Sequence, residues 1–144
     1  MTYLFADTSA IARCYFPDEP ESHVLRTQLF SGAVVFASEL VTVELRRAVA
    51  AAVRAGRIRR GAPTMQVAER DFAVATFQQL PISEAVLRSA ERLVETHPLG
   101  TLDALHLATA LTAGRALAGD EPFVFVTRDQ AQADAARAEG LAVT

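Results

Sequence analysis

Short apolar runs alternate with helical segments along this sequence, and this alternation restricts the possible folds more than any other feature. The runs have the composition of buried strands. They are YLFA at 3–6, AVVFA at 33–37, QLPI at 79–82, FVFVT at 123–127 and LAV at 141–143. One or two predicted helices separate each run from the next, an order typical of a largely parallel sheet with helices on both faces. We therefore predict a three-layer α/β/α sandwich with a mainly parallel central sheet.

Polar caps begin the predicted helices, and proline or glycine ends most of them. Asp7, Thr8 and Ser9 supply N-cap chemistry for the first helix, and Ser38 and Thr101 are the predicted N-caps of two later ones. The helices are expected to cover roughly residues 8–16, 20–32, 39–56, 63–77, 84–96, 102–118 and 129–140. No linker, repeat or low-complexity tract divides the chain, so residues 1–144 are predicted to form one domain.

The composition is that of a globular protein rather than a disordered or membrane-spanning one. Hydrophobic residues make up 51% and charged residues 22% of the chain, both ordinary values for globular domains. No apolar run approaches the ~18 residues that span a bilayer, and no basic leader precedes the first strand. The single cysteine, Cys14, permits no internal disulfide. We therefore expect a cytoplasmic protein that does not bind membranes.

Acidic residues follow two of the predicted strands. Asp7 follows the first strand, and Asp129 follows FVFVT. Sites in open α/β sheets lie beyond the carboxyl ends of the strands, although either aspartate alone is equally consistent with helix capping. Three neighbouring hydroxyls, Thr8, Ser9 and Thr127, are interpreted as caps or as donors that orient these acids.

Two further acids interrupt the apolar stripes of helices. Glu44, predicted in mid-helix, is aligned with Val41, and Asp103 is aligned in the same way with Leu107. Carboxylates are seldom buried without a partner, and only Asp103 has the partial explanation that a first helical turn favours negative charge. His106 lies on the same side of its helix as Asp103 and is interpreted first as a hydrogen-bonded core residue.

The four acids either find separate arginine or backbone partners, or converge on one cleft. Two carboxylates ~5 Å apart repel by roughly 3 kcal/mol at an effective dielectric constant of 20, and a divalent cation removes that cost. Carboxylates without a histidine or cysteine pair at ligand spacing favour Mg²⁺ or Mn²⁺ over zinc. Such sites activate water for attack on a phosphodiester bond.

The basic residues number fourteen and are all arginine. The absence of lysine excludes a P-loop, Schiff-base chemistry and lysine-assisted phosphoaspartate chemistry, and the net charge of −3 argues against a wholly basic surface. Six arginines without an intervening acid lie at Arg46, Arg47, Arg54, Arg57, Arg59 and Arg60. They form either a solvated surface or a phosphate-binding flank. Arg46 and Arg47 are expected to point away from the stripe that contains Glu44.

Four segments in order, LFADTSAI, SELVTVELRRA, LDALHLATAL and FVFVTRD, resemble the PIN-domain ribonucleases. The resemblance covers essentially the whole chain and is closest to the stand-alone toxins of bacterial VapBC toxin–antitoxin pairs. It implies an endoribonuclease that depends on Mg²⁺ or Mn²⁺ and leaves 5′-phosphate and 3′-hydroxyl ends. It also implies a homodimer and a cognate antitoxin that covers the cleft, bound mainly by residues 9–31 and 39–77.

The resemblance also assigns roles to the acids. Asp7, Glu44 and Asp103 would hold the principal ion, and Asp129 would hold a second ion or position water. After Asp129 the chain departs from the family's pattern, because Gln130-Ala131 replaces the usual continuation. The expected RNA contacts are Arg46, Arg47, Arg54 and Arg57.

Several rival functions share part of this pattern. Haloacid-dehalogenase phosphatases and receiver domains need a lysine that the chain lacks, and flap-type DNA nucleases need more chain for their DNA-clamping elements. The alternative that stays open is a catalytically silent PIN-like module that binds RNA or protein. Metal-dependent cleavage separates it from an enzyme. The sequence does not indicate which RNA would be cut.

Overall fold

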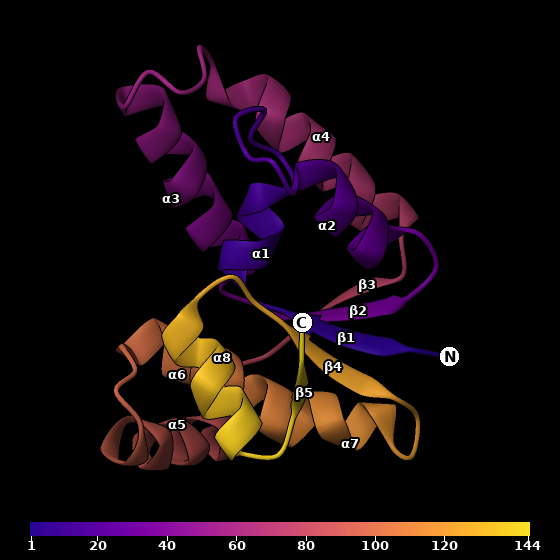
Figure 1. Ribbon diagram of the computed structural model, residues 1–144, viewed down its shortest axis with the longest axis vertical. Helices are drawn as coiled ribbons and strands as arrows, with labels where there is room; N and C mark the ends of the chain where they lie inside the picture. Colours follow the sequence, from indigo (N-terminus) through magenta and orange to yellow (C-terminus); the bar gives the residue numbers. More distant parts are fainter.

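The computed structural model describes residues 1–144 and contains one sheet of five strands, all of them parallel (Figure 1). The strands are β1 (Tyr3–Ala6), β2 (Val34–Ser38), β3 (Phe77–Leu80), β4 (Phe123–Val126) and β5 (Ala142–Val143). Their order in the sheet is β3-β2-β1-β4-β5. The chain therefore builds outward from β1 in one direction and then returns to build outward in the other. The point between β1 and β4 where the order reverses is where open α/β sheets place their ligands.

Helices cover both faces of the sheet (Figure 1). One layer contains α1 (Thr8–Arg13), α2 (Ser22–Phe30), α3 (Val41–Arg54) and α4 (Gly61–Val74). The other contains α5 (Glu84–Thr96), α6 (Thr101–Thr109), the π-helical segment η1 (Ala110–Gly114), α7 (Arg115–Ala118) and α8 (Gln130–Ala138). The predicted α/β/α sandwich is confirmed. None of these helices combines the length and the apolar character that a membrane span requires.

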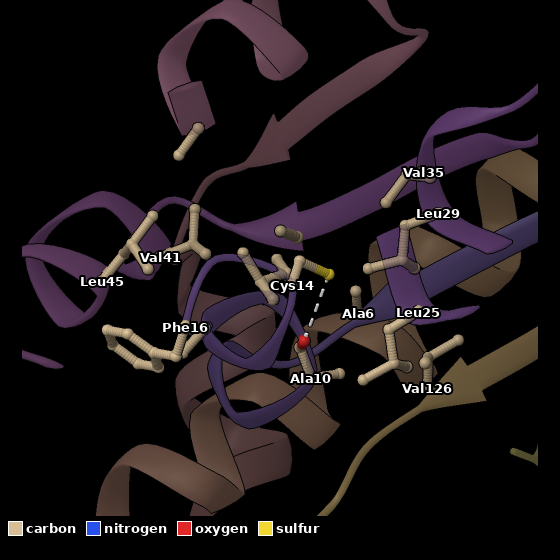
Figure 2. Close-up of a cluster of buried hydrophobic side chains, with 14 of the residues drawn as sticks. Ala6, Ala10, Cys14, Phe16, Leu25, Leu29, Val35, Val41, Leu45 and Val126 are labelled. Carbon is tan, nitrogen blue, oxygen red and sulfur yellow. Dashed lines mark hydrogen bonds between the residues drawn. The ribbon is translucent and has the colours of Figure 1, made fainter. Parts of the chain in front are cut away.

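The two layers bury separate apolar cores, and β1 contributes to both. Leu4 and Ala6 pack with the α1–α4 layer, whereas Phe5 packs with the opposite layer and stacks on Phe125. This pattern explains why the strands are continuous apolar runs, since a parallel sheet is buried on both faces. Figure 2 shows the first core around Cys14, a buried thiol that donates a hydrogen bond to the carbonyl of Ala10.

The edge strand β3 lies earlier in the chain than predicted. It comprises Phe77–Leu80 rather than QLPI, and α4 correspondingly ends at Val74 rather than continuing to Phe77. The Phe77 ring stacks on that of Phe72 with 4.2 Å between ring centres, which fixes the start of the strand. Pro81 lacks the N–H that would continue a ladder, and it lies beyond the last residue of the strand.

Other helix limits also differ from the expectation by a few residues, and three of the differences affect the description of the site. The first helix ends at Arg13, short of residue 16. Ser38 is the last residue of β2 rather than a helix N-cap; its hydroxyl accepts from the backbone N–H of Leu40, and α3 begins only at residue 41. The helix predicted over 102–118 begins after Gly100 and widens into η1, whose Gly114 lies where an added Cβ would be 3.0 Å from a phenylalanine ring.

Candidate active site

A cleft of about 210 Å³ lies at the carboxyl ends of β1 and β4, the edge of the sheet opposite the labelled N-terminus in Figure 1. All four predicted acids line it. The full set of lining residues is Asp7, Thr8, Ser9, Ala12, Glu44, Arg47, Ala48, Asp103, His106 and Asp129. The structure therefore selects convergence over four separate acid–arginine pairs.

Each of the four acids lies at the N-terminal end of a different helix. Asp7 and Asp129 are the N-caps of α1 and α8, and Glu44 and Asp103 lie in the first turns of α3 and α6. The expectation that Glu44 lies in mid-helix is wrong because α3 starts later than predicted. The partial positive charge of a helix N-terminus favours a carboxylate. Four such ends meeting at one edge explain how the fold tolerates this concentration of acids.

The Asp7 carboxyl is held by four hydrogen bonds. Ser9 Oγ (2.7 Å) and the backbone N–H of Ala10 (3.1 Å) donate to Oδ1, while Thr127 Oγ1 (2.8 Å) and Gln132 Nε2 (2.6 Å) donate to Oδ2. The residue is only 1% exposed. Burial raises the pKa of Asp7 above its ordinary value, although the hydrogen bonds act against this rise. Ser9 and Thr127 were interpreted either as helix caps or as donors that orient the acids. Both donate to Asp7, in agreement with the second interpretation.

Glu44 shares a buried contact with His106. Its Oε1 meets His106 Nε2 and also accepts from Thr8 Oγ1 at 3.0 Å. Burial acts to raise the pKa of Glu44, but the hydrogen bond and charge of His106, helped by Thr8 and Arg47, bring it below its ordinary value. His106 is buried and hydrogen-bonded as expected, although its partner is a candidate site residue and its Nδ1 has no partner.

Asp103 experiences the negative charge of the other acids most directly. Its Oδ1 accepts from Gln132 Nε2 at 3.0 Å. Partial burial, followed by the charges of Asp129, Asp7 and Glu44, raises the pKa of Asp103 above its ordinary value. Because the acids repel one another, binding of a cation or a proton at this site lowers its free energy.

The donor set fits a hard divalent cation in its chemistry. Glu44, Asp103 and Asp129 each have one carboxylate oxygen that accepts no hydrogen bond from the protein, and oxygen ligands are those preferred by Mg²⁺ and Mn²⁺. In this arrangement, however, no three acidic, histidine or cysteine residues form a ready metal-binding group. Binding an ion would therefore require some of these side chains to change their orientation.

Of the four arginines predicted to contact RNA, only Arg47 lines the cleft. It forms no ion pair, and the expectation that it points away from Glu44 is wrong. Arg46 instead pairs with a glutamate of α4, and Arg57 forms a two-pronged pair with an aspartate of the α1–α2 connection. Arg54 lies at the far end of α3. The run of arginines is therefore dispersed rather than gathered on one phosphate-binding surface.

Gln132 is a residue at this site that the sequence interpretation missed. The pattern Asp129-x-x-Gln132 is typical of a local capping box, and half of that box forms, because Asp129 Oδ1 accepts from the backbone N–H of Gln132 at 2.8 Å. The Gln132 side chain, however, turns to Asp7 and Asp103 instead of Asp129. The sequence signal is a glutamine among alanines on the inner face of α8.

A family model described as PIN domain matches residues 4–138. The chain therefore belongs to the PIN domain family. A comparison with curated proteins finds no match.

Solved structures share the fold at low sequence identity. FitAcB from Neisseria gonorrhoeae is 21% identical, with a TM-score of 0.62 over 97% of this chain and 95% of that one. PAE2754 from Pyrobaculum aerophilum is 17% identical, with a TM-score of 0.67 over 99% and 89%. VapBC2 from Rickettsia felis, bound to a DNA fragment from its promoter, is 14% identical, with a TM-score of 0.61 over 98% and 97%. At these identities the likeness establishes the fold.

Proposed function

We propose that this protein is an endoribonuclease that depends on Mg²⁺ or Mn²⁺ and hydrolyses RNA phosphodiester bonds in the acidic cleft. One observation carries the proposal: four carboxylates from four helix N-termini line one cleft, and no arginine forms an ion pair with any of them. Membership of the PIN domain family supports a nuclease. The products would carry 5′-phosphate and 3′-hydroxyl ends.

The proposed roles of the acids are those that the resemblance to the PIN-domain ribonucleases assigns. Asp7, Glu44 and Asp103 would hold the principal ion, and Asp129 would hold a second ion or position the attacking water. Asp7 is the most rigid of them because four hydrogen bonds fix its carboxyl. When bound, the ion would polarise the scissile phosphate and lower the pKa of the water. Thr8, Ser9 and Thr127 would keep their carboxylate partners oriented.

RNA binding would rely on Arg47 beside the acids, because Arg47 lines the cleft and forms no ion pair with a carboxylate. Arg46, Arg54 and Arg57 would contribute only at the flank. Contacts to phosphate of this kind give salt-sensitive binding without sequence choice.

We also propose that the protein acts in the cytoplasm as the toxin of a toxin–antitoxin pair, as a homodimer with a cognate antitoxin. The likeness to VapBC2 and to FitAB bound to IR36 DNA supports this role. The antitoxin would bind mainly the α1–α4 layer, over residues 9–31 and 39–77.

The test is cleavage of RNA by purified protein with Mg²⁺, Mn²⁺ or a chelator. Cleavage should require the metal and should be lost in Asp7→Asn and Asp103→Asn. Asp120→Asn is the matched control, because Asp120 is an exposed carboxylate between α7 and β4, away from the cleft. Cleavage by both cleft variants at the parental rate would disprove the assignment.

The competing function is a catalytically silent module that binds RNA or protein. The arrangement of the side chains gives it some support, because the acids have hydrogen-bond partners within the protein and are not grouped as metal ligands. It predicts that the parental protein binds RNA and leaves it intact under every metal tested.

A further inference from the structure

We infer that Gln132 is a positioning residue whose single amide holds Asp7 and Asp103 at a fixed separation. The inference rests on the proposed function, since it concerns how the cleft is prepared to receive a divalent cation. Gln132 does not line the cleft itself. Its action would pass entirely through the two carboxylates to which it donates.

The geometry is that of a clamp made from one nitrogen atom. Gln132 Nε2 lies 2.6 Å from Asp7 Oδ2 and 3.0 Å from Asp103 Oδ1. An amide nitrogen carries two hydrogens, so each carboxylate accepts one. The three residues come from the end of β1, the first turn of α6 and the first turn of α8. The amide therefore connects three elements of the carboxyl edge of the sheet.

The orientation of the Gln132 amide is fixed by the hydrogen bonds that its two N–H groups donate, and not by its oxygen. The residue is 1% exposed, and its Oε1 has no hydrogen-bond partner. A buried acceptor without a partner is costly. Rotating the amide by half a turn would not relieve this cost, because it would aim the oxygen at two carboxylates. Gln132 thus keeps both N–H groups on the acids and leaves its acceptor unpaired.

Helix capping does not account for this side chain. A capping glutamine at this position would accept from the backbone N–H of Asp129, the N-cap. That N–H instead donates to Thr127 Oγ1 at 3.0 Å. The glutamine is therefore free of the capping role that its sequence pattern suggests, and it serves the acids.

The test compares Mn²⁺ binding by calorimetric titration in RNA-free protein for the parent, Gln132→Met and Gln130→Met. Methionine preserves length and apolar volume but removes both donors. Gln130 is the matched control, since it lies on the same helix and also donates to a carboxylate, that of Asp134, but on the exposed surface. Loss of an outer hydrogen-bond partner of a metal ligand typically weakens binding ~10–100-fold.

We expect Gln132→Met to weaken Mn²⁺ binding by about ten-fold or more, and Gln130→Met to bind as the parent does. If Gln132→Met does not fold, Gln132→Asn takes its place in the test. Asparagine keeps the amide but is one methylene too short to reach both acids, so this variant should also weaken Mn²⁺ binding. Parental affinity in a folded Gln132 variant would overturn the inference and leave the proposed function standing. Absence of Mn²⁺ binding by the parent itself would overturn both.

A measurement on the metal-free protein distinguishes a role of Gln132 through its two hydrogen bonds from a role through its volume alone. Gln132→Met should lower the melting temperature of the metal-free protein, because Asp7 and Asp103 then face each other without a shared donor. The same substitution should cost less in an Asp103→Asn background, where one of the two charges is gone. An equal fall in both backgrounds would show that the amide does not act on Asp103.

Discussion

The carboxylates outside the cleft and those that line it differ in whether arginine compensates their negative charge. Outside the cleft, hydrogen bonds from Arg57 hold the pKa of Asp18 below its ordinary value, and hydrogen bonds with Arg92 and His97 do the same for the half-buried Glu139. In the cleft, burial raises the pKa of Asp7 and, with neighbouring negative charge, that of Asp103. The chain has fourteen arginines, yet none forms an ion pair with a cleft acid. Glu44 is the cleft acid whose pKa is lowered, and its partner is His106 rather than an arginine.

This contrast shows that the unfavourable electrostatic free energy of the fold comes mainly from repulsion between the cleft acids. Exposed ion pairs are each worth ~1 kcal/mol or less, so the surface network is a weak contributor to stability. The cleft acids are tolerated by helix N-termini and by hydrogen bonds from neighbouring side chains, but their repulsion remains. A divalent cation would remove it. Substitutions in the two regions should therefore have effects that differ in size and, for pH, in sign.

The largest expected effect is on catalysis. Asp103→Asn should lower metal-dependent RNA cleavage by about a hundred-fold or more, because loss of a ligand should exceed the ~10–100-fold cost of losing an outer partner. Glu139→Gln removes a half-buried carboxylate that is paired to Arg92 and does not line the cleft, so it should leave the rate unchanged. Initial rates on one RNA substrate measure both. A similar loss in the two variants would erase the distinction between the regions.

The next largest effect is on stability in the presence of metal. A cation that binds only the folded protein stabilises it by about 2.7 kcal/mol at a concentration one hundred times its dissociation constant. Mn²⁺ should therefore raise the melting temperature of the parent and of Glu139→Gln, but raise that of Asp103→Asn far less. Thermal melts with Mn²⁺ and with a chelator make the comparison. An equal rise in all three would place the ion outside the cleft.

A smaller effect is expected on RNA affinity. Arg47→Ala should weaken binding and reduce the slope of log affinity against log salt by about one, the value for a single phosphate contact. Arg57→Ala should have a smaller effect on both quantities, because the Arg57 guanidinium is hydrogen-bonded to Asp18 and lies over Phe16. Binding titrations at several salt concentrations, with metal omitted to prevent cleavage, provide the measurement. Equal slopes for Arg47→Ala and the parent would remove Arg47 from the RNA contact.

The smallest effect is on the pH dependence of metal-free stability, where the two regions should differ in sign. The raised pKa of Asp103 means that the folded state binds its proton more tightly, so this group's contribution falls as pH rises from the ordinary aspartate pKa of about 3.9. The lowered pKa of Glu139 makes its contribution present at higher pH and lost as pH falls through the folded pKa.

Unfolding by urea from pH 3 to pH 7 should therefore give opposite trends for two variants. Asp103→Asn should gain stability relative to the parent as pH rises, and Glu139→Gln should lose it. Parallel curves for the two variants would mean that the cleft acid is compensated as fully as the surface one.

Much of the architecture follows directly from the sequence. The runs that became β1, β2 and β4 are apolar at every position that the two cores need, so their strand character is visible without the structure. The edge strand β3 is different. Gln78 and Gln79 are exposed, and the position of the strand is fixed by stacking of Phe77 on Phe72, a contact between elements that no local pattern encodes.

The candidate site likewise has some features that could be predicted from the sequence and others that could not. Its acids are visible because carboxylates interrupt apolar stripes or follow strands, and the structure brings Asp7, Glu44, Asp103 and Asp129 to one cleft. The direction of Arg47 was predictable from the sequence, because Arg47 lies three residues after Glu44 and positions three apart are neighbours on a helix surface. Gln132 escaped prediction because its pattern with Asp129 suggests a local cap, whereas its partners are distant in the chain.

The most direct test is a crystal structure of the protein grown or soaked with Mn²⁺, with the ion located from its anomalous scattering. We predict a peak in the cleft, ligated by oxygens of Asp103 and at least one other of the four acids. A cleft without a peak at saturating Mn²⁺, its acids still hydrogen-bonded only to protein, would contradict the claim that this negative charge exists to receive a cation.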